Sequence, residues 1–180
     1  MDWQQQKVLF ERCRGGDIDD VVGLLSSAER RVHVNTPNRM NQIPLYIACE
    51  QGHAEVARYL LGNGAYVSNN YGSRIYKPLI AAVRYNHYEC VKLLLENHAD
   101  ANCHDSRGET PLQYQPNDIE VIFLLLQYDA IPSASLAGTA VQLLNHAKSE
   151  HTQAVEKMID ENIINLTSEN IFPAAFHFAF

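Results

Sequence analysis

Residues 43–65, with the sequence IPLYIACEQGHAEVARYLLGNGA, and residues 77–99, with the sequence KPLIAAVRYNHYECVKLLLENHA, follow one pattern at an offset of 34 residues. Both stretches carry a proline-leucine pair near their start, a histidine at the same position, and a leucine pair before a final alanine. A third copy opens at Thr110-Pro111-Leu112, 33 residues after Lys77, and ends at Ala130. Self-similarity at a period of about 20 to 50 residues indicates structural repeats that stack on one another.

This pattern resembles the ankyrin repeat, whose core reads Thr-Pro-Leu-His-x-Ala-Ala, followed by Gly-His, Leu-Leu and Gly-Ala, at a period of about 33 residues. The resemblance implies an all-α solenoid of stacked helix–turn–helix units with short β-hairpin or extended fingers. The residue types support this independently. Thr110 can cap a helix and Pro111 suits the first helical position. The apolar run 121–126 predicts a helix buried between neighbours, and Asn63-Gly64 predicts a helix end with a left-handed residue.

The same register covers nearly the whole chain and predicts one domain over residues 1–180. The expected divisions are a divergent first repeat at 1–37, repeat 2 at 38–70, repeat 3 at 71–104, an irregular repeat 4 at 105–135, repeat 5 at 136–168, and a partial repeat 6 or cap at 169–180. The last segment carries Phe172, Phe176, Phe178 and Phe180, where an array ordinarily ends in a polar capping repeat. We therefore expect the array to continue in a longer protein. The alternative is an aromatic cap that folds back or pairs with a second copy.

Composition narrows the classes of protein to which the chain can belong. The formal net charge of −7 argues against a general nucleic-acid binder, which needs a basic surface to meet phosphates. No apolar run approaches the roughly 18–20 residues that cross a bilayer, and the polar start carries no signal-peptide core. We expect a cytoplasmic protein, with a nuclear location as a second option, that binds neither nucleic acid nor membrane. Its four cysteines are then expected to be reduced thiols.

No motif for catalysis stands out. The chain has no glycine-rich phosphate loop, no GxSxG and no HExxH, so we expect neither an enzyme nor a cofactor. His98, Cys103 and His104 lie close together in sequence, but no fourth ligand accompanies them, so no metal site is expected. Cys49 and Cys90 occupy apolar helix positions typical of buried thiols.

The resemblance assigns a structural role to three other histidines. His53, His87 and His151 fall on the Gly-His position, where the family uses histidine to join turns through hydrogen bonds.

Two irregularities interrupt the repeat pattern. Repeat 4 is two residues short, and Pro116 falls inside its first helix, where proline is poorly tolerated. We expect a local notch there in the concave face, with a harmless deletion absorbed by a loop as the alternative. The finger at 70–77 is one residue longer than standard and carries Tyr71, Arg74 and Tyr76, residue types that anchor interfaces.

The resemblance implies that partners meet the finger tips and the exposed end of each first helix. The matching positions are Arg14, Arg39, Met40, Gln42, Glu50, Gln51, Arg74, Tyr76, Arg84, Tyr85, Arg107, Glu109 and Lys148. Five of the nine arginines fall there, although the chain as a whole is acidic. The planar guanidinium group can bind a carboxylate or phosphate through two hydrogen bonds. A row formed by Arg39, Arg74, Arg84 and Arg107 therefore predicts an acidic or phosphorylated partner segment. The alternative is ordinary solvated arginines, some paired with Glu50, Glu109 or Asp105.

The sequence thus predicts a protein–protein interaction module, a scaffold or signalling domain that binds a partner protein or peptide through its concave face and finger tips. Two alternatives stay open. One is a regulatory sensor of a small phosphorylated ligand, held by Arg84 and Tyr85 beside Pro116. The other is a substrate-docking domain of a larger enzyme or ubiquitin ligase. The sequence leaves the oligomeric state open.

Overall fold

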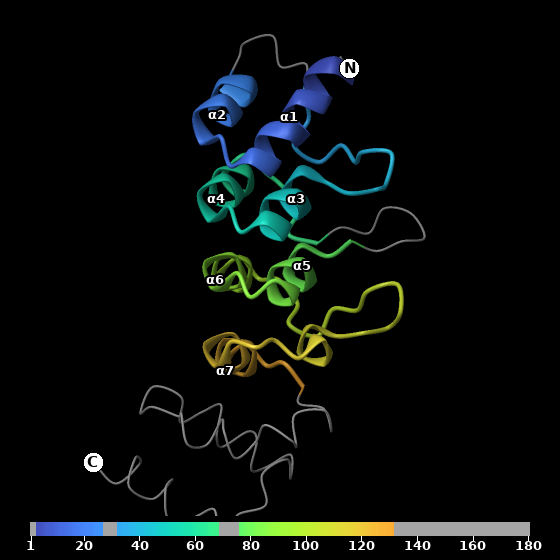
Figure 1. Cartoon of the computed structure of the whole chain (residues 1–180), viewed down its shortest axis with the longest axis vertical. Helices are drawn as coiled ribbons and strands as arrows, with labels where there is room; N and C mark the ends of the chain where they lie inside the picture. Colours follow the sequence, from blue (N-terminus) through green and yellow to red (C-terminus); the bar gives the residue numbers. More distant parts are fainter. Residues whose placement is uncertain (1–2, 27–31, 69–75, 132–180) are drawn as a thin grey trace, which may run out of the picture.

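Helices follow one another in pairs along the chain, and the pairs stack in a column (Figure 1). The computed structural model describes residues 3–26, 32–68 and 76–131. Its elements are α1 (Trp3–Gly15), α2 (Ile18–Ser26), α3 (Pro44–Gln51), α4 (Ala54–Gly62), α5 (Pro78–Arg84), α6 (Tyr88–Glu96), the 3-10 helix η1 (Pro111–Tyr114) and α7 (Ile119–Gln127). No strand occurs within these ranges, so the all-α solenoid is confirmed. The described parts of the fingers are extended loops.

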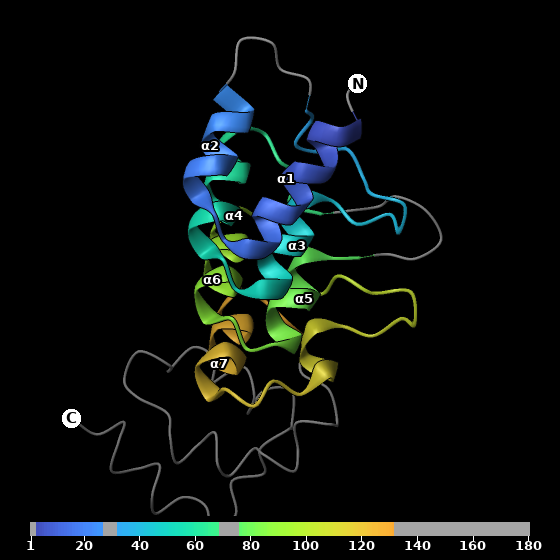
Figure 2. The ribbon, with the colours of Figure 1, turned by 45° about the horizontal axis from the view of Figure 1, so that its top comes forward.

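The helices form two layers. The first helices of the pairs, α1, α3, α5 and η1, contact one another in that order, and the second helices α2, α4, α6 and α7 do the same. The tilted view in Figure 2 shows the fingers projecting on the side of the first layer. The predicted repeat 5, the partial repeat 6, and His151 lie outside the described residues.

The start of each first helix follows from its proline. Pro44, Pro78 and Pro111 occupy the first turn of α3, α5 and η1, each after a residue in extended conformation. The backbone N–H groups of the first turn have no acceptor within the helix, so proline, which lacks this group, suits the position. The second layer is held by apolar side chains, and every residue from 121 to 126 in α7 is buried, as predicted.

Histidine rings join consecutive repeats. The Nε2 atom of His53 lies 2.9 Å from the carbonyl oxygen of Arg14, and that of His87 lies 3.1 Å from the carbonyl oxygen of Glu50. A Cβ atom added at Gly52 would lie only 2.6 Å from the His87 ring, and Gly52 has a φ of 80°. This position therefore requires glycine both for its backbone conformation and for the ring of the next repeat. The predicted structural role of these two histidines is confirmed.

The joint between repeats 3 and 4 is built differently. Asn86 stands where Gly52 stands one repeat earlier, and Asp118 stands where the next histidine would be. The Asp118 N–H donates to the side-chain oxygen of Asn86 at 3.2 Å. Because no imidazole ring packs on this turn from Asp118, a side chain at Asn86 can be accommodated at its φ of 55°.

The first helix of repeat 4 is reduced to η1. It ends at Tyr114, and Gln115 follows with a φ of 49° before the buried Pro116. The predicted interruption before Pro116 is confirmed. At the start of η1, the Thr110 N–H donates to the side-chain oxygen of Gln113 at 2.7 Å.

None of the helices in the described ranges has the length and apolar character needed to cross a bilayer.

Candidate functional site

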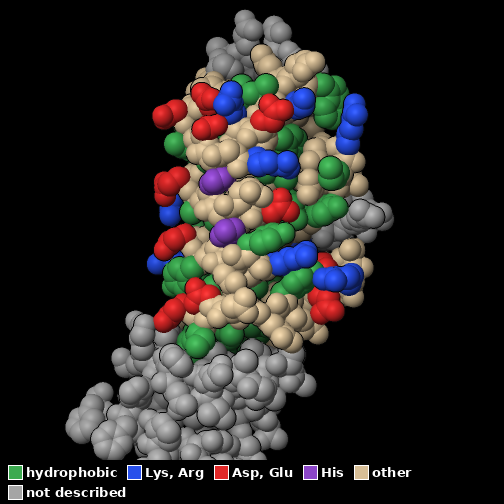
Figure 3. All heavy atoms as spheres, in the orientation of Figure 1, with side chains coloured by type: hydrophobic (Ala, Val, Ile, Leu, Met, Phe, Trp, Pro, Cys, Tyr) green, Lys and Arg blue, Asp and Glu red, His purple; other side chains and the backbone are tan. Residues whose placement is uncertain are grey.

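The first-layer helices and the finger tips border a groove in which basic and aromatic side chains gather. The second-layer helices begin with acidic residues, namely Asp19, Asp20, Glu55, Glu89 and Glu120. By contrast, α1 and α5 end with Arg12, Arg14 and Arg84. Figure 3 shows this separation, with acidic side chains predominating along the edge formed by α2, α4 and α6. Although the chain is acidic overall, its groove side is not.

The two described finger tips share one construction. The Oδ1 atom of Asn38 accepts the N–H groups of Met40 and Gln42 at 2.8 and 3.0 Å. The Oδ1 atom of Asp105 accepts those of Arg107 and Glu109 at the same two distances. Side chains of this kind close tight turns by replacing a backbone acceptor. The tips therefore hold the residues between these anchors, which include Arg39, Met40 and Arg107, in a defined direction.

Six of the residues predicted to bind a partner are exposed, namely Arg39, Met40, Gln51, Arg84, Tyr85 and Arg107. Three are half-buried, namely Glu50, Tyr76 and Glu109. Arg14 is also exposed, whereas Arg74 and Lys148 lie outside the described residues. These placements do not test whether any of them binds a partner.

Gln42 is placed differently from the other residues predicted to bind a partner. Its side chain accepts a hydrogen bond from the Asn38 amide at 2.9 Å, and the residue is only 8% exposed. Its amide group therefore helps to hold the finger tip together. That Gln42 also contacts a partner stays a prediction, and position within the repeat did not reveal that this residue turns inward.

Two pockets of the groove are lined by residues that the structure describes. The N-terminal pocket, of about 800 Å³, is lined by residues that include Trp3, Phe10, Arg14, Arg39 and Met40. Sequence reasoning missed the contribution of Trp3 and Phe10. The signal was present, because residues 3, 7, 10 and 14 are spaced as one face of a helix.

The second pocket, called here the tyrosine pocket, has a volume of about 270 Å³. Its lining includes Tyr46, Tyr76, Tyr85 and Tyr114, together with Lys77, Arg84, Asp105 and Arg107. The Cζ atom of Arg84 lies 5.8 Å from the ring centroids of both Tyr85 and Tyr114. Tyr114 is the last residue of η1, so the shortened helix of repeat 4 forms part of this pocket. Sequence reasoning did not select Tyr46 or Tyr114.

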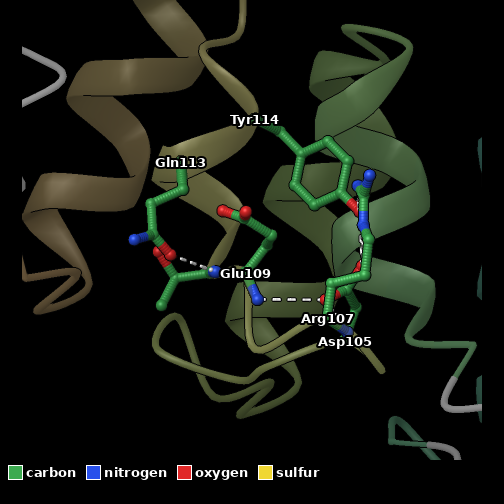
Figure 4. Close-up of polar contacts among 6 residues, drawn as sticks. Asp105, Arg107, Glu109, Gln113 and Tyr114 are labelled. Carbon is green, nitrogen blue, oxygen red and sulfur yellow. Dashed lines mark hydrogen bonds and ion pairs between the residues drawn. The ribbon is translucent and has the colours of Figure 1, made fainter.

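Arg107, Tyr114 and Asp105 form a compact polar network beside the pocket (Figure 4). Arg107 Nη2 donates to the Tyr114 hydroxyl oxygen at 2.6 Å, and that hydroxyl donates to Asp105 Oδ2 at 2.6 Å. Arg107 also pairs with Asp105 at 3.4 Å. The alternative that some arginines pair with nearby carboxylates is thus confirmed for Arg107.

The network alters the acidity of its members. Burial opposes ionisation of Asp105, but hydrogen bonds from Tyr114 and from the N–H groups of Glu109 and Arg107 outweigh it and lower the carboxyl pKa. For Tyr114, burial and the hydrogen bond to Asp105 both raise the pKa. The hydrogen bond to Tyr114 raises the pKa of Arg107. These shifts extend the pH range over which Asp105 is ionised and Tyr114 is protonated.

Comparison with known proteins is consistent with this architecture. The family model described as "Ankyrin repeats (many copies)" matches residues 66–114, and the one described as "Ankyrin repeat" matches residues 40–70.

Several curated proteins are similar to the chain. A putative ankyrin repeat protein FPV014 of Fowlpox virus (strain NVSL) is 33% identical over 128 residues, which are 68% of this chain and 28% of that protein. The Homo sapiens ankyrin repeat and SOCS box protein 16 is 33% identical over 132 residues, 71% of this chain and 29% of that protein. The Oryza sativa subsp. japonica probable E3 ubiquitin-protein ligase XBOS33 is 31% identical over 136 residues, which are 73% of this chain and 25% of that protein. The chain thus spans less than a third of the length of these relatives.

Proposed function

We propose a function for the groove on the basis that this chain belongs to the ankyrin-repeat family. In this proposal the groove binds an acidic segment of a partner protein. Ankyrin repeats are generally protein–protein interaction modules and typically have no enzymatic activity. The acidic character of the segment is our own inference from the side chains of the groove.

The observation that carries this proposal is the state of Arg84. Its guanidinium carbon lies over the rings of Tyr85 and Tyr114, 5.8 Å from each centroid. No ion pair or hydrogen bond from this side chain is found among the residues that the structure describes. An exposed arginine without an ion-pair partner retains its hydrogen-bond donors for a partner protein. Arg39 adds a further exposed arginine, at the finger tip closed by Asn38.

Charge reversal tests the proposal directly. The double variant Arg39→Glu/Arg84→Glu is compared with the wild type and with Lys92→Glu, which reverses an exposed charge on α6 away from the groove. Each protein captures partners from lysate of its source cells, and mass spectrometry quantifies them. We expect one or more proteins that are retained by the wild type and by Lys92→Glu but lost by the double variant. Equal recovery by all three would place the binding surface elsewhere.

A second candidate function is substrate docking for a ubiquitin ligase. It is favoured by two relatives, of which one is named a SOCS box protein and the other a probable E3 ubiquitin-protein ligase. If the chain docks substrates for a ubiquitin ligase, a partner captured through the groove should accumulate in source cells from which the gene for this protein has been deleted. An unchanged half-life of that partner would leave only the simple interaction module.

A further inference from the structure

The orientation of Arg84 is unusual for a surface arginine. Arg84 ends α5, and its guanidinium carbon lies 5.8 Å from the rings of Tyr85 and Tyr114. At these distances the faces of the two rings attract the cation, and this interaction leaves its positive charge in place. The tyrosines therefore hold the cation without neutralising it.

Arg107 is also positioned in advance. Tyr114 accepts a hydrogen bond from it and lies 5.4 Å below its guanidinium carbon, measured to the ring centroid. Asp105, the one carboxylate among the described residues that line the pocket, already accepts from the Tyr114 hydroxyl and from two backbone N–H groups. Because these side chains are already ordered, binding of a ligand would cost them less conformational entropy.

Two guanidinium groups, those of Arg84 and Arg107, line the tyrosine pocket, and only Asp105 is anionic among the described lining residues. Two planar sets of donors can serve three acceptor oxygens, which is more than a single carboxylate offers. A phosphoryl monoester carries between about 1.5 and 2 negative charges at neutral pH and presents three acceptor oxygens.

The size and the walls of the pocket narrow the ligand further. Pockets that enclose whole small ligands have volumes of roughly 300–1,000 Å³. The tyrosine pocket has about 270 Å³, which favours one side chain of a larger partner over an enclosed metabolite. Tyr85 is 49% exposed, with the guanidinium carbon of Arg84 over its ring and the His87 ring centroid 6.2 Å from its own. An aromatic ring on the ligand could pack edge-to-face against the exposed part of Tyr85.

We propose that the tyrosine pocket binds a phosphotyrosine side chain, with its phosphoryl group between Arg84 and Arg107 and its ring against Tyr85. This inference rests on the proposed function in one respect, namely that the phosphotyrosine belongs to a partner protein. The affinity of the pocket for an aromatic phosphate can be measured without any partner.

The test uses phenyl phosphate as the probe and benzoate as a ligand with the same ring but one negative charge. Binding of each is measured by NMR titration at pH 7.5 and constant ionic strength. The wild type is compared with Arg84→Gln and with Lys92→Gln, a matched loss of a positive charge outside the pocket. A thermal melt confirms that each variant is folded.

We expect saturable binding of phenyl phosphate to the wild type and to Lys92→Gln, with benzoate binding more weakly. Arg84→Gln should raise the Kd for phenyl phosphate about tenfold, because it removes a charged two-point donor. No saturable binding, equal affinity for benzoate, or an unchanged Kd in Arg84→Gln would overturn the proposal.

A second arm separates this inference from the proposed function. An acidic peptide with one phosphotyrosine is compared with its unphosphorylated form. If the wild type binds both peptides with equal affinity and Arg84→Gln weakens the binding of both alike, the phosphotyrosine site is excluded while the acidic-segment function stands. If phenyl phosphate binds but both peptides bind no more tightly than it does, the pocket stands and the proposed partner function fails.

Discussion

Gly52 illustrates how one residue couples two repeats. It adopts a φ of 80°, and the His87 ring of the next repeat occupies the space into which a side chain would extend. We expect Gly52→Ala to lower the free energy of unfolding by about 1–2 kcal/mol, through backbone strain and steric overlap. Denaturant unfolding would measure the change. Gly62→Ala is the matched control, because Gly62 lies in α4 with no atom near the added Cβ and should be neutral or stabilising by up to about 1 kcal/mol.

The same position offers a double-mutant cycle with His87. If steric overlap with the ring is part of the cost, Gly52→Ala/His87→Ala should be less destabilised than the sum of its single variants. Strict additivity would show that only backbone strain matters at this turn.

Asp105 carries a prediction on pH. Its counterpart at the other described tip is Asn38, so asparagine can preserve the turn, and only the bonds to Tyr114 and Arg107 depend on the carboxylate. We expect Asp105→Asn to cost about 1 kcal/mol of unfolding free energy at pH 7, and Asp105→Ala to cost about 1–3 kcal/mol.

The pH dependence has a definite direction. Because the folded-state pKa of Asp105 is below its ordinary value of 3.8, its ionised form adds stability above that value, and the stability is lost as pH falls through the folded pKa. The difference between the wild type and Asp105→Asn should therefore be constant from pH 7 to about 5 and shrink below about 4, as followed by denaturant unfolding. A difference that persists at the acidic end would assign the cost to packing.

The cysteines should be unreactive in the folded protein. Burial raises the pKa of Cys13 to about 12, and burial is also the main cause that raises that of Cys103 to about 12. Cys49 and Cys90 are fully buried, as the sequence predicted, and although the hydrogen bond with Cys49 lowers the pKa of Cys90, burial keeps a reagent away from its sulfur. At pH 8 a thiol reagent should therefore label the native protein slowly and all four thiols rapidly after unfolding in guanidinium chloride. Rapid native labelling of even two thiols would contradict this placement.

At the scale of elements, predictions succeeded where one repeat determines its own conformation. The prolines at the starts of α3, α5 and η1, the buried α7 and the interruption before Pro116 all follow from local residue types. The histidine joints were predicted because the family resemblance supplied them.

Predictions fell short where side chains contact one another in ways that the repeat pattern does not encode. The inward turn of Gln42 depends on its contact with Asn38 inside the same finger tip. The pairing of Arg84 with Tyr114 joins residues 30 positions apart on two first-layer elements. No pattern within a single repeat contains this information, so the tyrosine pocket could only be found from the structure.

At the scale of the whole molecule, the described helices of each repeat pack mainly against each other and against those of the neighbouring repeats. The four described pairs of helices therefore form one continuous apolar interior, with their first helices on the same side of the column (Figure 1). This arrangement places side chains from distant parts of the chain along one surface. It is also why a change in one joint is expected to act mainly on adjacent repeats.

The separation of charge between the two edges of the column has a kinetic consequence. An acidic molecule approaching from solution is repelled by the edge of α2, α4 and α6 and attracted to the arginine side, so it is oriented before contact. For an acidic partner, added salt should slow association far more than it changes dissociation, which stopped-flow mixing at several ionic strengths would resolve. The acidic residues that start the second helices would then speed recognition without touching the partner, because they reduce the number of unproductive encounters.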